Sequence, residues 1–103
     1  MIVRIWKATA SVARADAYPA HFSAAVSPNL RKLAGFAGGR LLRRRTGDHV
    51  EFMVVTQWES WQAITAFAGA DPDVAVVDSQ ARAMLVQHDS CVQHFEVVQE
   101  TSI

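Results

Sequence analysis

The spacing of hydrophobic residues changes along the chain, and each change predicts a new element. Residues 2–8 alternate in the two-residue period of a β-strand. An apolar stripe at intervals of three or four residues then predicts a helix. Asp16 precedes this stripe as a helix N-cap, Pro19 falls in its first turn and Gly35 ends it. The stripe consists of Tyr18, Phe22, Val26, Leu30 and Leu33.

A proline lies inside this predicted helix. Pro28 removes one backbone donor and its ring crowds the preceding turn. We therefore expect either a kink at this point or a restart of the helix capped by Ser27.

Two β-rich segments follow, separated by a short turn. Residues 40–45 and 49–58 predict strands, and the intervening Thr46-Gly47-Asp48 favours an antiparallel hairpin. Within the first strand, Arg43, Arg44 and Arg45 precede acidic residues, which indicates cross-strand ion pairs on a solvated surface rather than a nucleic-acid site.

The last third of the chain predicts two helices and a strand. Ser60 caps a short helix that ends at Gly69. Asp71 and Pro72 have the pattern of a cap followed by a first-turn proline, which predicts a third helix through about Gln87. Residues 91–98 predict the final strand, and the last few residues predict a frayed tail.

The order of elements is β-α-β-β-α-(α)-β. This order predicts an α+β fold of the ferredoxin-like, split β-α-β type, with a four-stranded antiparallel sheet and helices on one face. No repeat or linker divides the chain, so residues 1–103 form one expected domain. The other face of the sheet would be bare. We expect a second copy to cover it, giving a homodimer of the dimeric αβ-barrel type.

The amino-acid composition argues against several classes of function and location. Ten basic residues balance ten acidic residues, so no net field favours nucleic acid or an anionic membrane. Cys91 is the only cysteine, and we expect it to be a small buried hydrophobe in a reducing compartment. The charged N-terminal residues fit neither a signal peptide nor a membrane span, which favours a cytoplasmic protein.

Four sequence stretches together suggest a family. They are Ile2-Val3-Arg4-Ile5-Trp6, Leu33-Ala34-Gly35-Phe36-Ala37-Gly38, Thr56-Gln57-Trp58-Glu59-Ser60 and Val92-Gln93-His94-Phe95-Glu96-Val97-Val98. In this order and at this length the chain resembles the antibiotic biosynthesis monooxygenase (ABM) domain. The Trp-Glu-Ser step is the most specific part, and it is a fold signature, since the serine caps a helix and the tryptophan packs.

The resemblance implies a homodimer with a pocket between each sheet and its helices. It also implies a choice among cofactor-free oxygenases of aromatic polyketides, quinol oxygenases and haem-degrading enzymes. The haem branch would use an asparagine near Lys7, a tryptophan at Phe67 and a histidine ligand near Val77. None of these residue types is present there, so we expect no haem chemistry and no cofactor.

Cofactor-free oxygenation needs a base, a partner for the substrate anion and a dry aromatic pocket. His21, beside the apolar stripe, and His94, in the last strand, are the candidate bases. The alternatives are a boundary histidine hydrogen-bonded to solvent for His21, which is the favoured interpretation of that residue, and a side chain on the dimer face of the sheet for His94. Trp6, Phe22, Trp61 and Phe67 are candidate aromatic contacts to a planar substrate or, alternatively, simple core residues. Arg82 is a candidate partner for an anionic oxygen. No histidines show metal-ligand spacing, so we predict no metal site.

Three readings remain open from the sequence. The first is a cofactor-independent monooxygenase of a small aromatic or quinol-type substrate. The second is a non-catalytic, small-ligand-binding or auxiliary homodimer, and the third is an enzyme of the same fold with other chemistry, such as isomerisation or decyclisation.

Overall fold

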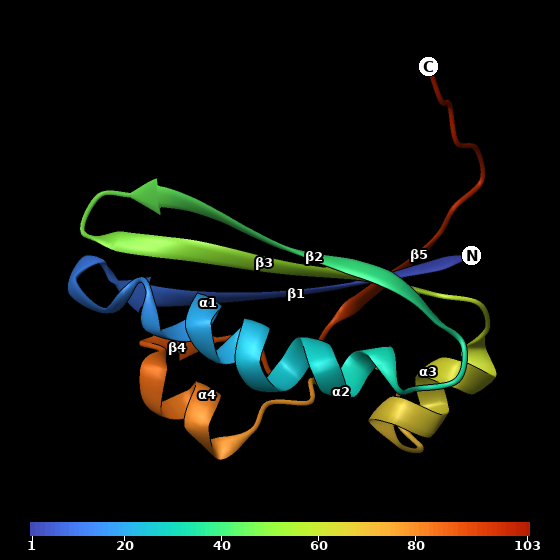
Figure 1. The fold of residues 1–103 in the computed structure, drawn as a ribbon, viewed down its shortest axis with the longest axis horizontal. Coiled ribbons are helices and arrows are strands. Elements are labelled where there is room, and N and C mark those ends of the chain that lie inside the picture. The colour runs from blue at the N-terminus through green and yellow to red at the C-terminus, as the bar shows by residue number, and fades with distance from the viewer.

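An antiparallel sheet forms one layer of the molecule, and the four α-helices lie together on one side of it in the computed structural model of residues 1–103 (Figure 1). The strands run in the order β2-β3-β1-β4, and β5 also pairs with β1. This arrangement confirms the predicted α+β, ferredoxin-like fold. The strands are β1 (Ile2–Ser11), β2 (Phe36–Thr46), β3 (His49–Trp58), β4 (Gln87–His88) and β5 (Gln93–Glu96).

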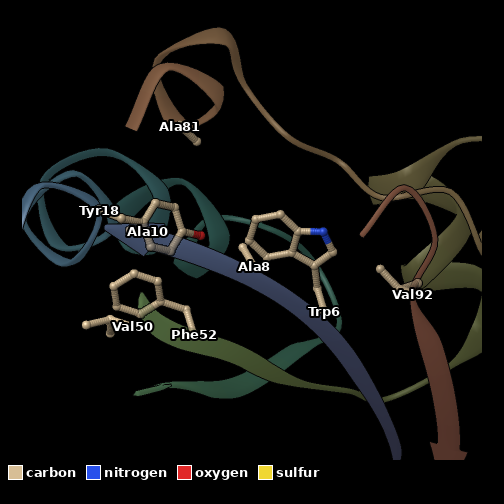
Figure 2. Close-up of a cluster of buried hydrophobic side chains, with 8 residues drawn as sticks. All are labelled: Trp6, Ala8, Ala10, Tyr18, Val50, Phe52, Ala81 and Val92. Atoms are coloured by element: carbon tan, nitrogen blue, oxygen red, sulfur yellow. The ribbon is translucent and has the colours of Figure 1, made fainter. Parts of the chain in front are cut away.

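Strict alternation along β1 and β3 separates the two faces of the sheet. Every second residue of β1, from Ile2 to Ala10, is buried towards the helices. Two clusters of apolar side chains fill this interface. The larger one contains Trp6, Ala8, Ala10, Tyr18, Val50, Phe52, Ala81 and Val92 (Figure 2). The smaller one contains Ile2, Leu30, Trp58 and Ile64.

The hairpin of β2 and β3 confirms the most strongly β-rich part of the sequence. Pairing runs from Phe36 opposite Trp58 to Thr46 opposite His49. β2 begins earlier than the predicted residue 40, because the glycine-rich join already pairs with β3 across a register shift after Phe36. Arg44 pairs with Glu51 at 3.1 Å, which confirms a cross-strand ion pair.

The first helical run spans residues 17–31 in three segments of two conformations, α and π. α1 (Ala17–His21) and α2 (Ser27–Arg31) flank a π-helical turn, η2 (Phe22–Val26), and a short 3₁₀ turn, η1 (Val12–Arg14), precedes them. Ser27 does not cap a restart, because its N–H donates to the Phe22 carbonyl five residues earlier. The chain thus departs from α geometry immediately before Pro28, whose ring lacks the donor that a continued helix requires.

The helix predicted to follow Ser60, α3 (Trp61–Ala68), begins at the predicted position. The Ser60 hydroxyl accepts a hydrogen bond from the Ala63 N–H at 3.1 Å. Ala63 also lies close to Gly35, where φ is +82° and a Cβ atom would stand 2.5 Å from the Ala63 Cβ. Position 35 therefore requires glycine both for its backbone conformation and for the close approach of α3.

The predicted third helix over residues 71–87 is wrong in its first half. Only α4 (Ser79–Met84) is helical, and Asp78, not Asp71, caps it by accepting a hydrogen bond from the Ala81 N–H at 2.7 Å. Residues 71–78 form instead an extended segment, because their backbone groups bond outside a helix. The Ala75 N–H donates to the Ser90 carbonyl, and the Asp73 carbonyl accepts from the Val92 N–H.

The fourth strand is split. β4 pairs with Ala8 and Thr9, whereas β5 pairs with residues 2–5 of β1. Between these two strands the chain bulges away from β1, and Cys91 forms an isolated antiparallel β-bridge with Val74. Cys91 is consequently exposed, which corrects the prediction that it is buried. No helix of the chain has the length and apolar run needed to span a membrane.

Candidate functional site

A cavity of about 330 Å³ lies between the sheet and the helical layer. Thirteen of its 17 lining residues are hydrophobic, and its size lies at the lower end of the range of small-molecule sites, about 300–1,000 Å³. β1 and β3 contribute one wall, the helical run from α1 to α2 the second, and residues 76–78 the third. Five lining residues carry polar groups on their side chains apart from the Trp6 indole: Arg4, Tyr18, Asn29, Thr56 and Asp78.

Tyr18 brings an unpaired hydroxyl into this apolar space. The residue is only 4% exposed, and its ring packs against Phe52 and Trp6 at centroid distances of 5.4 and 6.1 Å. In Figure 2 the hydroxyl oxygen lies on the side of the ring that faces Trp6 and Ala8. No buried side-chain oxygen lacks a partner, so this hydroxyl, which bonds to no group of the chain, is open to the cavity. Burial, and then the charge of Asp78, raise the pKa of Tyr18, which keeps the phenol protonated.

Asp78 and His21 form a polar pair in the cavity wall. The Asp78 Oδ2 lies 2.9 Å from the His21 Nε2, and its Oδ1 accepts from the Ala81 N–H. The His21 side chain is 7% exposed, whereas that of Asp78 is 49% exposed. Burial tends to raise the pKa of Asp78, but hydrogen bonds from His21 and the helix N-terminus outweigh it, so the pKa is lowered. The carboxylate lines the cavity, and the imidazole stands behind it.

Arg4 is a buried cation that also lines the cavity. Its guanidinium donates to the carbonyls of Pro72 and Val74 and lies 5.6 Å from the centre of the Phe67 ring. Its NH1 also lies 3.0 Å from the His94 Nε2. On the other side of that imidazole, Nδ1 lies 3.2 Å from the Asp73 carboxylate. Three side chains thus form a polar chain from the cavity wall to the surface.

This arrangement fixes the tautomer of His94. Arginine only donates and an ionised carboxylate only accepts, so Nε2 must carry the lone pair and Nδ1 the proton. Burial, and then the charge of Arg4, lower the pKa of His94 against the opposing effect of Asp73. His94 is therefore neutral, with both ring nitrogens engaged inside the protein.

Only some of the candidate residues from the sequence line the cavity. Trp6, Phe22 and Phe67 line the cavity, together with Tyr18 and Asp78. Trp61 lies outside the lining, 46% exposed, with its ring against His94 at a centroid distance of 5.0 Å. Arg82 is exposed on α4 and does not reach the cavity.

Three polar residues of the site escaped the sequence analysis as functional candidates. Tyr18 appeared there only as a member of the apolar stripe, and Asp78 stood within a helix that does not form. Arg4 carried a usable signal, because it occupies a position of β1 that faces the same side as Trp6. A charged residue at an inward strand position indicates a buried polar network.

The lining does not fit haem. Lys7 is exposed and alternates away from the helix-facing side of β1, and Phe67 and Val77 occupy cavity positions without any coordinating atom. The lining contains no histidine or cysteine, the residues that most often bind haem iron. No group of three or more potential metal-ligating residues occurs elsewhere in the chain.

Comparison with known proteins now assigns the fold to a family. The profile described as antibiotic biosynthesis monooxygenase matches residues 1–78. The chain belongs to this ABM family. No curated protein sequence matches it. The ABM match supports a role in small-molecule oxygenation or binding.

Solved structures agree with this assignment. A candidate antibiotic biosynthesis monooxygenase from Bacillus cereus superposes with a TM-score of 0.71 at 14% identity, covering 99% of this chain and 95% of that one. The monooxygenase ActVA-Orf6 of Streptomyces coelicolor, solved with nanaomycin D, has a TM-score of 0.64 at 19% identity and coverages of 99% and 89%. The haem degrader MhuD of Mycobacterium tuberculosis, with two haems in its active site, has a TM-score of 0.64 at 26% identity and coverages of 99% and 100%.

Proposed function

We propose that this ABM-family chain is a cofactor-independent monooxygenase of a small phenolic or quinol-type substrate. The observation that carries the proposal is the Tyr18 hydroxyl, which is unpaired and open to an apolar cavity that the Asp78 side chain also lines. A donor and an anion in the wall of one cavity complement a substrate hydroxyl, which accepts from one and donates to the other. Trp6, Phe22 and Phe67 supply aromatic surface for a planar ring.

The polar pair supplies the base in this proposal. Asp78 accepts the hydrogen bond of the substrate hydroxyl, and His21 behind it stabilises the negative charge and stores the proton. Each carboxylate oxygen has two acceptor sites, so the existing bonds to His21 and the Ala81 N–H leave room for the substrate. Tyr18, kept protonated by its raised pKa, donates to the phenolate oxygen as charge develops there.

Dioxygen is the co-reactant and the oxidant. The phenolate transfers one electron to dioxygen, and the resulting substrate radical and superoxide combine in a new C–O bond at the para ring carbon. The displaced ring proton and the stored proton leave with one oxygen atom as water, and the other oxygen remains as a quinone carbonyl. The balance is phenol plus dioxygen to quinone plus water. The apolar walls protect the intermediates from solvent.

Oxygen uptake tests this proposal. The purified chain, without added cofactor, is assayed against a panel of anthrones, naphthols and quinols beside an autoxidation blank. Tyr18→Phe removes one oxygen atom but keeps the ring that packs on Phe52 and Trp6. We expect kcat/KM to fall about a hundredfold, as for loss of an oxyanion donor. Arg44→Ala, on the exposed surface of the hairpin and outside the lining, is the control and should keep its rate.

Two outcomes contradict the monooxygenase proposal. Uptake that never exceeds the blank would do so, and saturable binding of a panel compound in its place would favour the non-catalytic binding role. Equal rates for Tyr18→Phe and wild type would exclude the assigned donor.

The uncovered face of the sheet supports a homodimer. Val3, Ile5, Met53 and Val55 are half-buried there, and Leu42 and Phe95 beside them are 45% and 53% exposed. A monomer would leave this apolar surface in water, whereas a second copy would bury it. Sedimentation at micromolar concentration should give a dimer that Phe95→Arg weakens. A wild-type chain that sediments only as a monomer would refute this association.

A further inference from the structure

The 71–78 segment closes one side of the cavity and is fixed near both of its ends by a histidine. It has no regular secondary structure of its own beyond the bridge from Val74 to Cys91. Its final three residues line the cavity. The position of this wall therefore depends on the side chains that hold the segment, not on a helix or a continuous strand.

The first attachment is the chain formed by Arg4, His94 and Asp73. Arg4 donates to two carbonyls of the segment, those of Pro72 and Val74, and to the His94 Nε2. The opposite nitrogen of the same ring bonds Asp73, which belongs to the segment. His94 comes from β5, so its ring ties the segment to the sheet edge as well as to the buried arginine.

We propose that His94 is a positioning residue and not a base: its neutral ring holds the 71–78 segment against the cavity, and its protonation releases that segment. A protonated ring has no acceptor for Arg4 and places a second positive charge 3.0 Å from the guanidinium nitrogen. The inference goes beyond the proposed reaction, because the wall must be closed for any ligand that the cavity binds.

The groups that face His94 determine the direction of its response. Arg4 approaches from β1 and Asp73 from the 71–78 segment, while α3 contributes the uncharged ring of Trp61. The buried arginine acts against protonation, and the carboxylate, whose side chain is 70% exposed, opposes it less effectively. Burial of the ring, and then the charge of Arg4, lower the pKa of His94, in agreement with this geometry.

The sign of the pH dependence follows. When the 71–78 segment is closed, the His94 ring binds a proton less readily than an ordinary histidine, whose pKa is about 6.5. The open form therefore takes up a proton as the pH falls through that value, and the closed form loses stability from there downward. At the second attachment the His21 ring contacts the Asp78 carboxylate and not an arginine. Release should begin at the Arg4 end.

Amide hydrogen exchange tests this release without any substrate, so its outcome is separate from that of the oxygenase assay. The reporters are the Ala75 and Val92 N–H groups, which bond Ser90 and Asp73 carbonyls across the attachment. The Phe52 N–H, in the fully buried part of β3 between β1 and β2, reports global opening. Between pH 7.5 and 5.5 the reporter protection factors should fall by up to about tenfold, with that of Phe52 unchanged.

His94→Gln provides the matched variant. A glutamine amide can accept from Arg4 and donate to Asp73, but it does not titrate. The protection factors of Ala75 and Val92 should then be independent of pH over the same range. The proposal would be overturned if these protection factors did not depend on pH in the wild type, or if His94→Gln kept the pH dependence of the wild type.

A second measurement needs no variant. Ring ¹⁵N shifts of the wild-type chain at pH 7 should show the His94 Nδ1 protonated and Nε2 unprotonated. The opposite tautomer, or a charged ring at that pH, would equally overturn the assignment.

Discussion

The two edges of the sheet are built in opposite ways. At one edge β2 pairs with β3 over ten residue pairs, from Phe36 opposite Trp58 to Thr46 opposite His49, with a single register shift between Phe36 and Gly38. At the other, β4 and β5 pair with β1 over two and four residues. Between them Trp6 and Lys7 of β1 face residues 89–92, so two residues stand opposite four.

This difference determines at which edge polar side chains bond to backbone groups. A continuous ladder satisfies its backbone groups internally and leaves side chains to pack or to face solvent. At the interrupted edge side chains take over part of that role. The Trp6 indole donates to the Asp89 carbonyl at 2.8 Å, and Arg4 bonds the carbonyls of the 71–78 segment. The broken edge therefore contributes the wall of the cavity, and the continuous edge contributes rigidity.

The largest expected loss of stability comes from a substitution of Trp58, which anchors the continuous edge in the core. Trp58 is fully buried, pairs with Phe36 across the hairpin and stacks on Phe67 with a centroid distance of 5.1 Å. Trp58→Ala should lower the free energy of unfolding by about 3–5 kcal/mol. Urea denaturation measures this change, and an unaltered midpoint would mean that Trp58 does not anchor the core.

A smaller effect is expected at the interrupted edge. Arg4→Met keeps an apolar stem over Phe67 but removes the donors to the Pro72 and Val74 carbonyls. Leaving such groups unpaired should cost about 1–3 kcal/mol in the same urea experiment. A neutral or stabilising result, as found for some buried ion pairs, would show that the segment does not depend on this cation.

The smallest effect is expected for the matched arginine on the opposite edge. Arg44 pairs with Glu51 on the surface, with its side chain 74% exposed. Arg44→Ala should change the free energy of unfolding by less than about 1 kcal/mol, and less at high salt. A loss as large as that of Arg4→Met would remove the energetic distinction between the two edges.

The continuous edge was also the part that the sequence predicted well. Local patterns suffice there, because alternating β-rich residues around a glycine turn define a hairpin by themselves. The helix over residues 71–87 was wrong because Asp71-Pro72 has the local pattern of a helix start. Contacts with Arg4, His94 and Ser90, all distant in sequence, determine that segment, and no local pattern contains them.

The candidate site could be predicted only in outline. Periodicity placed Phe22 in the apolar helical stripe, and Phe22 lines the cavity, but periodicity left open which face of the first strand carries Trp6. It gave no pairing for the two candidate histidines. His21 finds its carboxylate 57 positions away and His94 finds its arginine 90 positions away, distances that only the folded chain can bridge.

The π turn at Phe22–Val26 has a consequence for how this cavity changes during evolution. A π turn holds one more residue than the α turn it replaces. Phe22, Ala25 and Val26 of this turn line the cavity, so a single-residue deletion here would rotate and shift the downstream wall residues Asn29, Leu30 and Leu33. Relatives can therefore acquire different ligand preferences through chain length in one helix, with every lining side chain retained.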